Sequence, residues 1–330
     1  MIDACDRCLR HSHLVAFRAG GPGRRADTRS FLAGFDLSAA RAGLAVDAVC
    51  AHSESFPDPL RDLSQPPAVL YSTDIGVLSS LDEPVAVVIG SRQPSEYGRT
   101  VAYGLGRGLG MAGVPVVSGL ALGIDAIAHG GCLDGGGRTV AVLASGVDVA
   151  YPRTNRRLYE RIREHGTIVS EMPPGTRPQR WLFPARNRIM AALGCVTVVV
   201  EAAERSGTLI TADCAADLGR DVAAVPGRVT SEVAAGTNGL LRSGAALVTG
   251  PQDVLDLMYG VGAREVPPTP APALDASERR IVELVARGAG LDDLGREAGL
   301  AAAAVRSTLA RLERRGVVRR APSGGYVPAA

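Results

Sequence analysis

Seven short runs of consecutive apolar residues lie between residues 84 and 259, and most are rich in β-branched side chains. They do not alternate with polar residues, which is the pattern of strands that helices cover on both faces. The runs are 85–90, 114–119, 139–145, 167–171, 196–201, 222–227 and 246–250. Segments of helical length separate most of them, at 97–112, 122–134, 154–165 and 208–219. This alternation predicts an α/β core at 84–259 with a doubly wound, mostly parallel sheet.

The segments on either side of this core have different patterns. Residues 1–83 predict a small, mainly helical and irregular region, which ends in a stretch with four prolines, "FPDPLRDLSQPPAVLYSTD". Residues 260–274 are proline-rich and nearly uncharged, as in a semi-stiff linker. Residues 275–330 predict three helices and a closing hairpin, the pattern of a winged helix. No apolar run is long enough for a membrane span and no signal peptide precedes the fold, so we expect a cytoplasmic protein without a membrane partner.

Positive charge is concentrated in one part of the chain. The net charge is +2 and every Lys or Arg is an arginine, yet residues 151–190 hold nine arginines against three glutamates. No Asp or Glu occurs from Met172 to Val200. A local excess of this kind indicates an anionic partner, although a solvated surface face would explain it equally well.

The stretch "RPQRWLFPARNRIM", residues 177–190, combines four arginines with aromatic and amide side chains. Phe183 offers a face on which a base can stack, and Asn187 can hydrogen-bond a base edge or a phosphate. Arginines interleaved with aromatics are typical of single-stranded nucleic-acid grooves. We expect Phe183 to be exposed, because it precedes a proline and lies near Arg186. Trp181, the only tryptophan, is expected to pack in the core.

Polar residues follow several of the predicted strands, where ligands bind in open α/β sheets. Glycine, serine and threonine at helix starts present free N–H groups and hydroxyls to phosphates. Ordinary N-capping explains any one of them, but three starts at one edge beside an arginine-rich loop favour phosphate binding. The residues concerned are Gly90, Ser91, Arg92, Ser95, Gly98, Ser118, Gly119, Ser206, Gly207 and Thr208.

Dinucleotide and ATP sites are not indicated, so no cofactor is expected. The glycines of "GLGRGLG", 104–110, miss the G-x-G-x-x-G spacing and lie inside a predicted helix, and no P-loop motif occurs. Asp125 and His129 share one helix face at i, i+4 and could form an acid–base pair. We favour a structural role for them, in fixing the helix against the sheet, and we assign no catalytic residue.

The cysteines do not predict a disulfide framework. Cys5-x-x-Cys8 and Cys50-x-His52 together offer partial zinc-ligand chemistry, but the two halves are far apart in the sequence. We therefore expect no metal. Cys195 and Cys214 lie in apolar or small-residue runs and are expected to be buried thiols.

Several long motifs occur in an order that resembles the DNA-processing protein A family, also called DprA or Smf. They are "GSRQPSEYG", "VSGLALGIDAIAHGGCL", "TVAVLASGVDVAYPRTNRRLYERI", "GTIVSEMPPGTRPQRWLFPARNRIMAAL", "VVVEAAERSGTLITADCAADLGRDVAAVPG" and "GTNGLLRSGAALV". The resemblance covers about residues 84–255. It implies an extended Rossmann-like core that binds single-stranded DNA during natural transformation, loads the RecA recombinase and acts as a homodimer in competent bacteria. No catalytic activity is established for that family.

The resemblance also implies roles for particular residues. Arg92 in "GSR" corresponds to a phosphate-binding arginine, and Arg153 in "YPRTN" to a basic residue, with Asn155 in the same motif. Two further motifs, "FPxRNR" and "SGxLIT", place Phe183, Arg186, Asn187, Arg188, Ser206, Gly207 and Thr208 on the DNA. Leu122 is a departure, since the family usually has arginine there. The N-terminal region is shorter than the sterile-alpha-motif domain of some members.

Two alternatives remain open. A nucleotide-processing enzyme of the phosphoribohydrolase type also uses a Rossmann-like core, but "ERSGTLIT" lacks the double glycine and the glutamate of its "PGGxGTxxE" motif. In the winged helix, the third helix carries Arg306, Arg311, Arg314 and Arg315. That helix enters the major groove in such folds, although a protein-docking role fits its small side chains slightly better.

Overall fold

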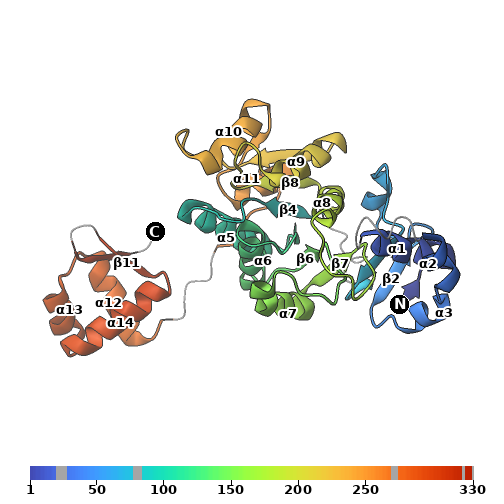
Figure 1. Cartoon of the computed structure of the whole chain (residues 1–330). Coiled ribbons are helices and arrows are strands. Elements are labelled where there is room, and N and C mark those ends of the chain that lie inside the picture. The colour runs from blue at the N-terminus through green and yellow to red at the C-terminus, as the bar shows by residue number, and fades with distance from the viewer. Residues whose placement is uncertain (20–27, 77–83, 269–273, 322–323, 329–330) are drawn as a thin grey trace. The chain divides into compact units, whose positions relative to one another are not determined.

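The computed structural model describes residues 1–19, 28–76, 84–268, 274–321 and 324–328. The chain divides into two compact units, residues 1–267 and 268–330 (Figure 1). Of the linker expected at 260–274, residues 269–273 lie outside the described residues. No helix in the described ranges has the length and apolar character needed to cross a membrane.

The first unit contains a sheet of ten strands in the order β1-β2-β3-β7-β6-β5-β4-β8-β9-β10. The strands are β1 (Ile2–Asp3), β2 (Asp47–Cys50), β3 (Val69–Ser72), β4 (Ala86–Ile89), β5 (Val116–Ser118), β6 (Thr139–Val142), β7 (Thr167–Ser170), β8 (Val196–Val199), β9 (Asp221–Ala224) and β10 (Ala246–Leu247). Only the β2–β3 and β3–β7 pairs are antiparallel. The predicted mostly parallel α/β sheet is therefore confirmed, with one strand in each of the seven apolar runs.

The N-terminal region, expected to be mainly helical and irregular over 1–83, contains helices but also three strands. Its strands β1, β2 and β3 extend the same sheet, and β3 pairs directly with β7. It also contains α1 (Asp6–Ala19), α2 (Thr28–Gly34), α3 (Leu37–Ala42) and the 3₁₀ helix η2 (Asp58–Asp62). These three strands lie next to polar residues or prolines, in "MIDACD", "AVDAVCAHS" and "QPPAVLYSTD", instead of in long apolar runs, which is why the sequence did not reveal them.

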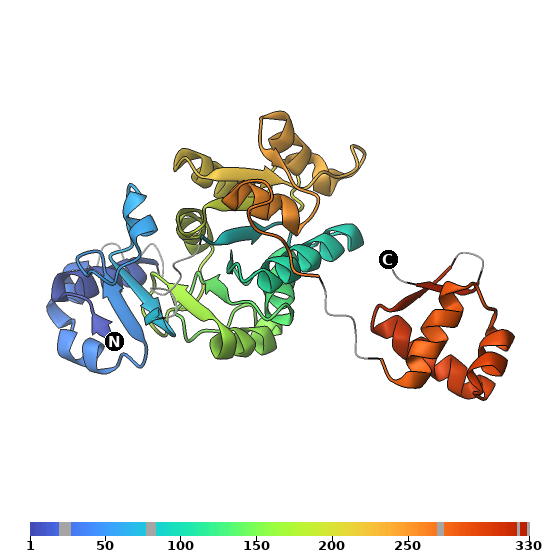
Figure 2. The same ribbon diagram turned by 180° about the vertical axis from the view of Figure 1, so that it is seen from behind.

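Helices cover both faces of the sheet (Figures 1 and 2). On one face α5 (Glu96–Met111), α6 (Ile124–Asp134) and α11 (Pro251–Tyr259) pack against β-strand residues such as Val88 and Val198. On the other, α8 (Leu182–Leu193) and α9 (Gly207–Asp217) pack against Val87 and Val199. Toward the N-terminal strands, α1 and α7 (Arg156–His165) share a cluster that includes Tyr71. The unit also contains α10 (Ala235–Arg242) and the 3₁₀ helices η3 (Arg153–Asn155) and η4 (Glu232–Ala234).

The glycines of "GLGRGLG" lie inside α5, as expected, and allow that helix to pack closely against a neighbour. A Cβ atom added at Gly106 would overlap the carbonyl oxygen of Ala128, and one at Gly110 that of Cys132. Both of those carbonyls belong to α6. The glycine spacing therefore serves helix packing beneath the sheet.

The second unit is a winged helix, as predicted. It contains α12 (Ala276–Ala286), α13 (Leu291–Ala298) and α14 (Ala302–Arg314), followed by the antiparallel strands β11 (Val318–Arg320) and β12 (Tyr326–Pro328). Glu278 is buried and accepts hydrogen bonds from Arg311 and Arg315. Two of the four arginines considered for DNA contact are thus paired inside the unit, and Arg315 caps α14 rather than lying within it.

The expected linker begins later than residue 260. Arg264 donates a hydrogen bond of 2.6 Å to the carbonyl oxygen of Ala112, and Val266 packs against the cluster under α5 and α11. The first residues after α11 therefore belong to the first unit.

Candidate nucleic-acid interface

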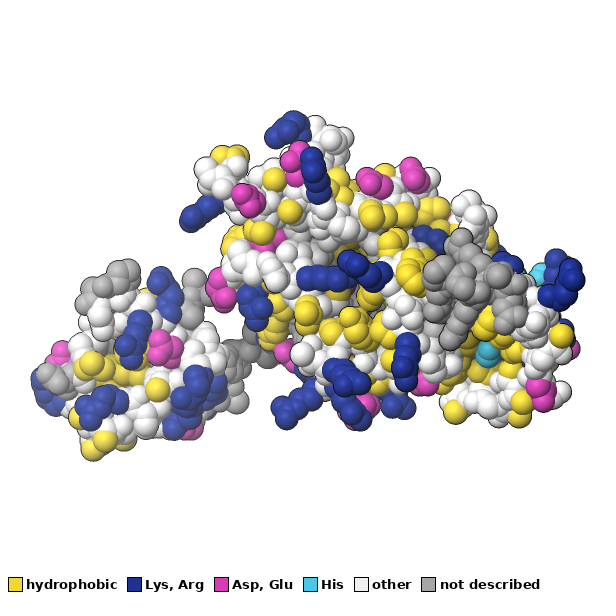
Figure 3. Space-filling model, viewed as in Figure 1, with side chains coloured by type: hydrophobic (Ala, Val, Ile, Leu, Met, Phe, Trp, Pro, Cys, Tyr) yellow, Lys and Arg dark blue, Asp and Glu magenta, His cyan; other side chains and the backbone are white. Residues whose placement is uncertain are grey.

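A pocket of about 840 Å³ opens at the carboxyl ends of β4, β5 and β8. Nine of the sixteen predicted site residues line it: Gly90, Ser91, Arg92, Phe183, Arg186, Asn187, Ser206, Gly207 and Thr208. Its charged lining consists of Arg92, Arg180 and Arg186 against the single carboxylate of Asp125. The space-filling view shows arginines over the middle of the first unit and along its edge near α7 (Figure 3). The lining favours an anionic ligand.

Arg92 lies in the turn between β4 and α5 and is exposed. Its guanidinium carbon lies 5.3 Å from the centroid of the Phe183 ring, and it makes no hydrogen bond or ion pair with any described residue. The backbone holds this turn in place, because the Ser91 amide donates to the Glu201 carbonyl at 2.7 Å. A Cβ atom at Gly123, whose φ is 80°, would overlap the Ser91 carbonyl oxygen. Among the described residues Arg92 therefore contacts the Phe183 ring but has no ion-pair partner, and the turn that carries it is held rigidly.

The arginine-rich stretch was expected to be a loop, but residues 182–193 form α8. Phe183, on the first turn of this helix, is half-buried, with its ring centroid 6.0 Å from that of Tyr151. Trp181 was expected to pack in the core, but its side chain is 52% exposed. Its position just before α8 leaves the indole outside the helix-on-sheet contact. The aromatic residues that line the pocket are Phe183, which is half-buried instead of exposed as expected, and Tyr151, which is 44% exposed; Trp181 lies outside the lining.

Arg186 is buried in the floor of the pocket, with only 4% of its surface exposed. It donates to the carbonyl oxygens of Gly119, at 2.7 Å, and of Val142. Burial lowers the pKa of Arg186 to about 10, and the nearby Asp125 carboxylate opposes this shift. A Cβ atom at Gly119 would overlap the guanidinium, so the glycine makes room for it. Arg186 was expected to hold phosphate from the surface; the structure uses much of its hydrogen-bonding capacity to join α8 to the sheet.

Arg188 does not line the pocket. It forms an ion pair with Glu171 at 2.5 Å. Burial raises the pKa of the Glu171 carboxyl, and Arg188 opposes that shift. Arg188 was expected to contact a phosphate. In the structure its positive charge is already compensated by the carboxylate of Glu171, which follows β7.

The start of α5 is occupied by a carboxylate. The Ser95 amide donates to Glu201 Oε2 at 2.8 Å, and the Ser95 hydroxyl donates to Glu201 Oε1 at 2.5 Å. A Cβ atom at Gly98 would overlap this carboxylate. Ser95 and Gly98 were expected to face a phosphate; instead Glu201 lies where that anion would bind.

The start of α9 remains open toward the pocket. Ser206 caps the helix by accepting from the Thr208 amide, and the Thr208 hydroxyl donates to the Gly90 carbonyl at 3.1 Å. Gly207 is exposed, and a Cβ atom there would have open space around it. This helix start and the turn at Arg92 therefore lie on the same pocket.

The remaining predicted residues support the pocket from outside. Ser118 is buried and donates to the Val88 carbonyl at 2.7 Å. The Asn155 side chain donates to the carbonyl of Leu120 at 2.9 Å; Leu120 is buried, has a φ of 55° and immediately precedes Ala121 in the pocket lining. Arg153 is exposed and lies outside the pocket lining. These contacts place Ser118 and Asn155 in positioning roles.

Asp125 and His129 have the structural role expected of them. Asp125 accepts from the Gly119 amide at 3.1 Å, and His129 Nδ1 lies 2.6 Å from the Thr139 hydroxyl. Burial raises the pKa of Asp125, and it lowers that of His129 to about 3. Each residue joins α6 to the sheet.

Twelve of the residues that line the pocket were not among the predicted site residues, and they include Arg180, Tyr151 and Leu122. A smaller hollow of about 60 Å³, lined in part by Arg92, Tyr151 and Phe183, adjoins the pocket. Arg180 lies in the stretch 177–190 and Tyr151 in "YPRTN". The predicted site residues next to them were the only indication in the sequence that these two residues line the site. Leu122 is 44% exposed at the rim.

Residues 47–259 match the family described as DNA recombination-mediator protein A, and residues 265–324 match the DprA winged helix domain. The chain belongs to the DprA family. The DprA match begins at residue 47, so it includes β2 and β3 and not only the core expected from residue 84. The additional strands are therefore part of the family domain.

Individual relatives and solved structures of the DprA family are also similar to this chain. The putative DNA processing protein DprA of Mycobacterium tuberculosis is 44% identical over 259 residues, which cover 77% of this chain and 67% of the relative. DprA of Bacillus subtilis is 38% identical over 204 residues, covering 62% and 68%. The Streptococcus pneumoniae DprA structure has a TM-score of 0.65 at 35% identity, covering 76% and 86%. A Helicobacter pylori DprA structure, described with its single-stranded DNA binding mode, has a TM-score of 0.58 at 30% identity, covering 66% and 96%.

Proposed function

We propose that the chain binds single-stranded DNA at the carboxyl edge of its sheet. Arg92 over the Phe183 ring is the observation that carries this proposal, because it presents a cation and an aromatic face together. Phosphates lie against Arg92 and the start of α9, and unpaired bases stack on Phe183 and Trp181. Arg153 and Arg180 extend the positive surface along the strand. Electrostatic contacts of this kind give salt-sensitive, sequence-tolerant binding.

The DprA membership supports roles beyond binding. We propose that the chain acts in natural transformation as a homodimer in the cytoplasm, and that it helps to load the RecA recombinase onto single strands. The Helicobacter pylori relative, described as binding single-stranded DNA, is the structural support for the ligand.

A non-catalytic function fits the pocket lining better than a nucleotide-processing enzyme. Asp125 is the only carboxylate among the described residues that line the pocket, and it is buried against Gly119 and Arg186. Incubation with nucleoside monophosphates should release no base. Base release that increases with protein concentration would instead support the phosphoribohydrolase alternative.

A titration of the full chain with labelled single- and double-stranded oligonucleotides tests the binding proposal. We expect tighter binding of the single strand at equal salt, because duplex bases are not free to stack. A chain ending at residue 267 should keep most of this affinity, since the pocket lies wholly in the first unit. Equal affinity for duplex, or loss of binding on truncation, would contradict the proposed site.

A further inference from the structure

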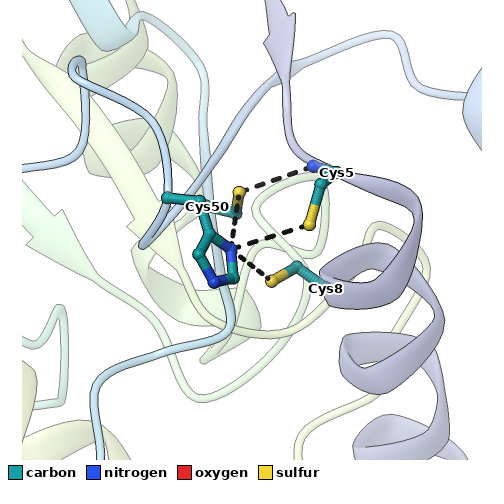
Figure 4. A group of neighbouring side chains, drawn as sticks. Cys5, Cys8 and Cys50 are labelled. Carbon is teal, nitrogen blue, oxygen red and sulfur yellow. Dashed lines mark hydrogen bonds between the residues drawn. The ribbon is translucent and has the colours of Figure 1, made fainter.

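Three cysteines and a histidine from the two halves of the N-terminal region converge at one point. The Sγ atoms of Cys5, Cys8 and Cys50 and a ring nitrogen of His52 all lie within 4.8 Å of one another. In Figure 4 the three labelled sulfur atoms face a common space beside the start of α1. The sequence placed these pairs too far apart to predict a metal, and the fold removes that separation.

The strand pairing explains how the halves meet. β1 and β2 are parallel, with Ile2 opposite Ala48. Cys5 follows β1, and Cys8 lies in the first turn of α1. On the other side β2 ends at Cys50, two residues before His52. The parallel register therefore brings the C-x-x-C pair alongside the C-x-H pair.

The distances from the His52 ring nitrogen to the three sulfur atoms fit a tetrahedral ion. His52 Nδ1 lies 3.7 Å from Cys5 Sγ, 3.4 Å from Cys8 Sγ and 3.8 Å from Cys50 Sγ. Zinc bonds of about 2.3 Å to sulfur and about 2.0 Å to nitrogen, at tetrahedral angles, separate the two ligand atoms by about 3.5 Å. One ring nitrogen cannot make hydrogen bonds to three thiols at once, whereas a central ion gives all three separations.

We propose that Cys5, Cys8, Cys50 and His52 bind a structural zinc ion. Three thiolates and one imidazole form a closed ligand set with no open position for a substrate. The ion would fasten the start of α1 to the end of β2. It lies outside the residues that line the DNA pocket, so the inference does not depend on the proposed function.

The position of α1 gives this fastening a structural consequence. From the proposed zinc ligands the helix runs toward the end of β7, where the Ser12 hydroxyl donates to the carbonyl of Glu171 at 3.3 Å. Near its other end, Val15 and Ala19 pack in a cluster with Leu182. By fixing the start of α1, zinc would therefore also stabilise the packing of α1 against Leu182 at the start of α8.

Metal analysis of the full chain, purified under reducing conditions and desalted after incubation with zinc, tests the proposal. We expect about one zinc per chain. Cobalt should give the visible absorption of a tetrahedral thiolate site. Cys50→Ser and His52→Ala should each lose most of the bound metal. Cys214→Ser and His165→Ala are matched controls outside the cluster, and both should retain it.

Thermal melting adds a second readout, because the effect of a chelator can be measured on the unaltered chain even if a cysteine variant fails to fold. A chelator should lower the melting temperature of the unaltered chain and of the two controls, and Cys5→Ser, at an exposed position, should be insensitive to the chelator. Much less than one equivalent of zinc in the reduced, folded chain would overturn the proposal. Equal metal content in His52→Ala would also overturn it, as would a disulfide among Cys5, Cys8 and Cys50 in the freshly isolated protein.

Discussion

The guanidinium carbon of Arg92 lies 5.3 Å from the centroid of the Phe183 ring, although the two residues come from different elements. Arg92 is held by the turn after β4, and Phe183 by the first turn of α8. A cation above a ring is stabilised by the ring's quadrupole, at about 0.5–1 kcal/mol when exposed. The pair therefore holds a phosphate-binding group and a base-stacking group in a fixed relation before any ligand arrives.

Arg92→Ala should weaken single-stranded DNA binding by about five- to thirty-fold, equivalent to about 1–2 kcal/mol, because a charge-assisted phosphate contact is lost. The slope of log affinity against log salt should fall by about 0.7. The melting temperature should stay close to that of the unaltered chain. Arg99→Ala, an exposed arginine on α5 outside the pocket, is the control and should bind normally. A large drop in melting temperature with unchanged affinity would reassign Arg92 to a structural role.

Phe183→Leu should preserve the packing behind α8 but remove the stacking face, with a loss of about 1–3 kcal/mol in binding free energy. The salt slope should not change, since no charge is removed. Trp181 is the only tryptophan and is 52% exposed, so its fluorescence can follow the titration. Unchanged affinity in Phe183→Leu, together with a loss in Trp181→Leu, would move the main stacking site to the tryptophan.

Leu122→Arg should strengthen single-stranded DNA binding. Leu122 is 44% exposed and lines both the pocket and the smaller hollow beside Phe183. An arginine there adds a cation near the path proposed for the phosphates, so the salt slope should rise by about 0.7. Leu122→Gln controls for loss of the apolar side chain. The same gain in both variants would show that charge is not the cause.

The sequence was informative wherever burial leaves a long pattern. Runs such as 85–90 and 196–201 predicted strands because covered parallel strands are apolar throughout. The sequence did not show which side chains pair with one another across the fold. Nothing near Ser95 indicates that Glu201, 106 residues away, fills the start of α5. Likewise, the pairing of Arg188 with Glu171 depends on the approach of α8 to β7, which no local pattern encodes.

The glycines of α5 give a test of helix packing. Gly106→Ala should destabilise the first unit by about 1–3 kcal/mol, because the added methyl group meets the Ala128 backbone, which cannot rotate away. Gly104→Ala, in the same helix with open space around it, should be neutral or stabilise the unit by up to about 1 kcal/mol. Denaturant unfolding followed by Trp181 fluorescence measures both. Equal effects would show that helix propensity, not the contact with α6, determines the outcome.

His129 should make the stability of the first unit depend on pH. Its pKa is lowered to about 3, first by burial and then by the positive charge of Arg186, whereas the ordinary value is 6.5. Above pH 6.5 the ring is neutral in both the folded and the unfolded chain, so it adds no pH dependence. As the pH falls below 6.5 the unfolded chain takes up a proton that the folded chain excludes. The free energy of unfolding therefore decreases by up to about 1.4 kcal/mol per pH unit until the pH approaches about 3.

Comparison with His129→Gln isolates this contribution, because the carboxylates that titrate at low pH are common to both proteins. The variant should be less stable at about pH 7.5, having lost the bond to Thr139, but its deficit should shrink as the pH falls toward about 4.5. Trp181 fluorescence during urea unfolding reports on the unit that contains His129. His165→Gln, at an exposed position, should follow the unaltered chain much more closely. A deficit in His129→Gln that stays constant with pH would mean that the folded protein accommodates the proton, and that the ring is not sealed between α6 and the sheet.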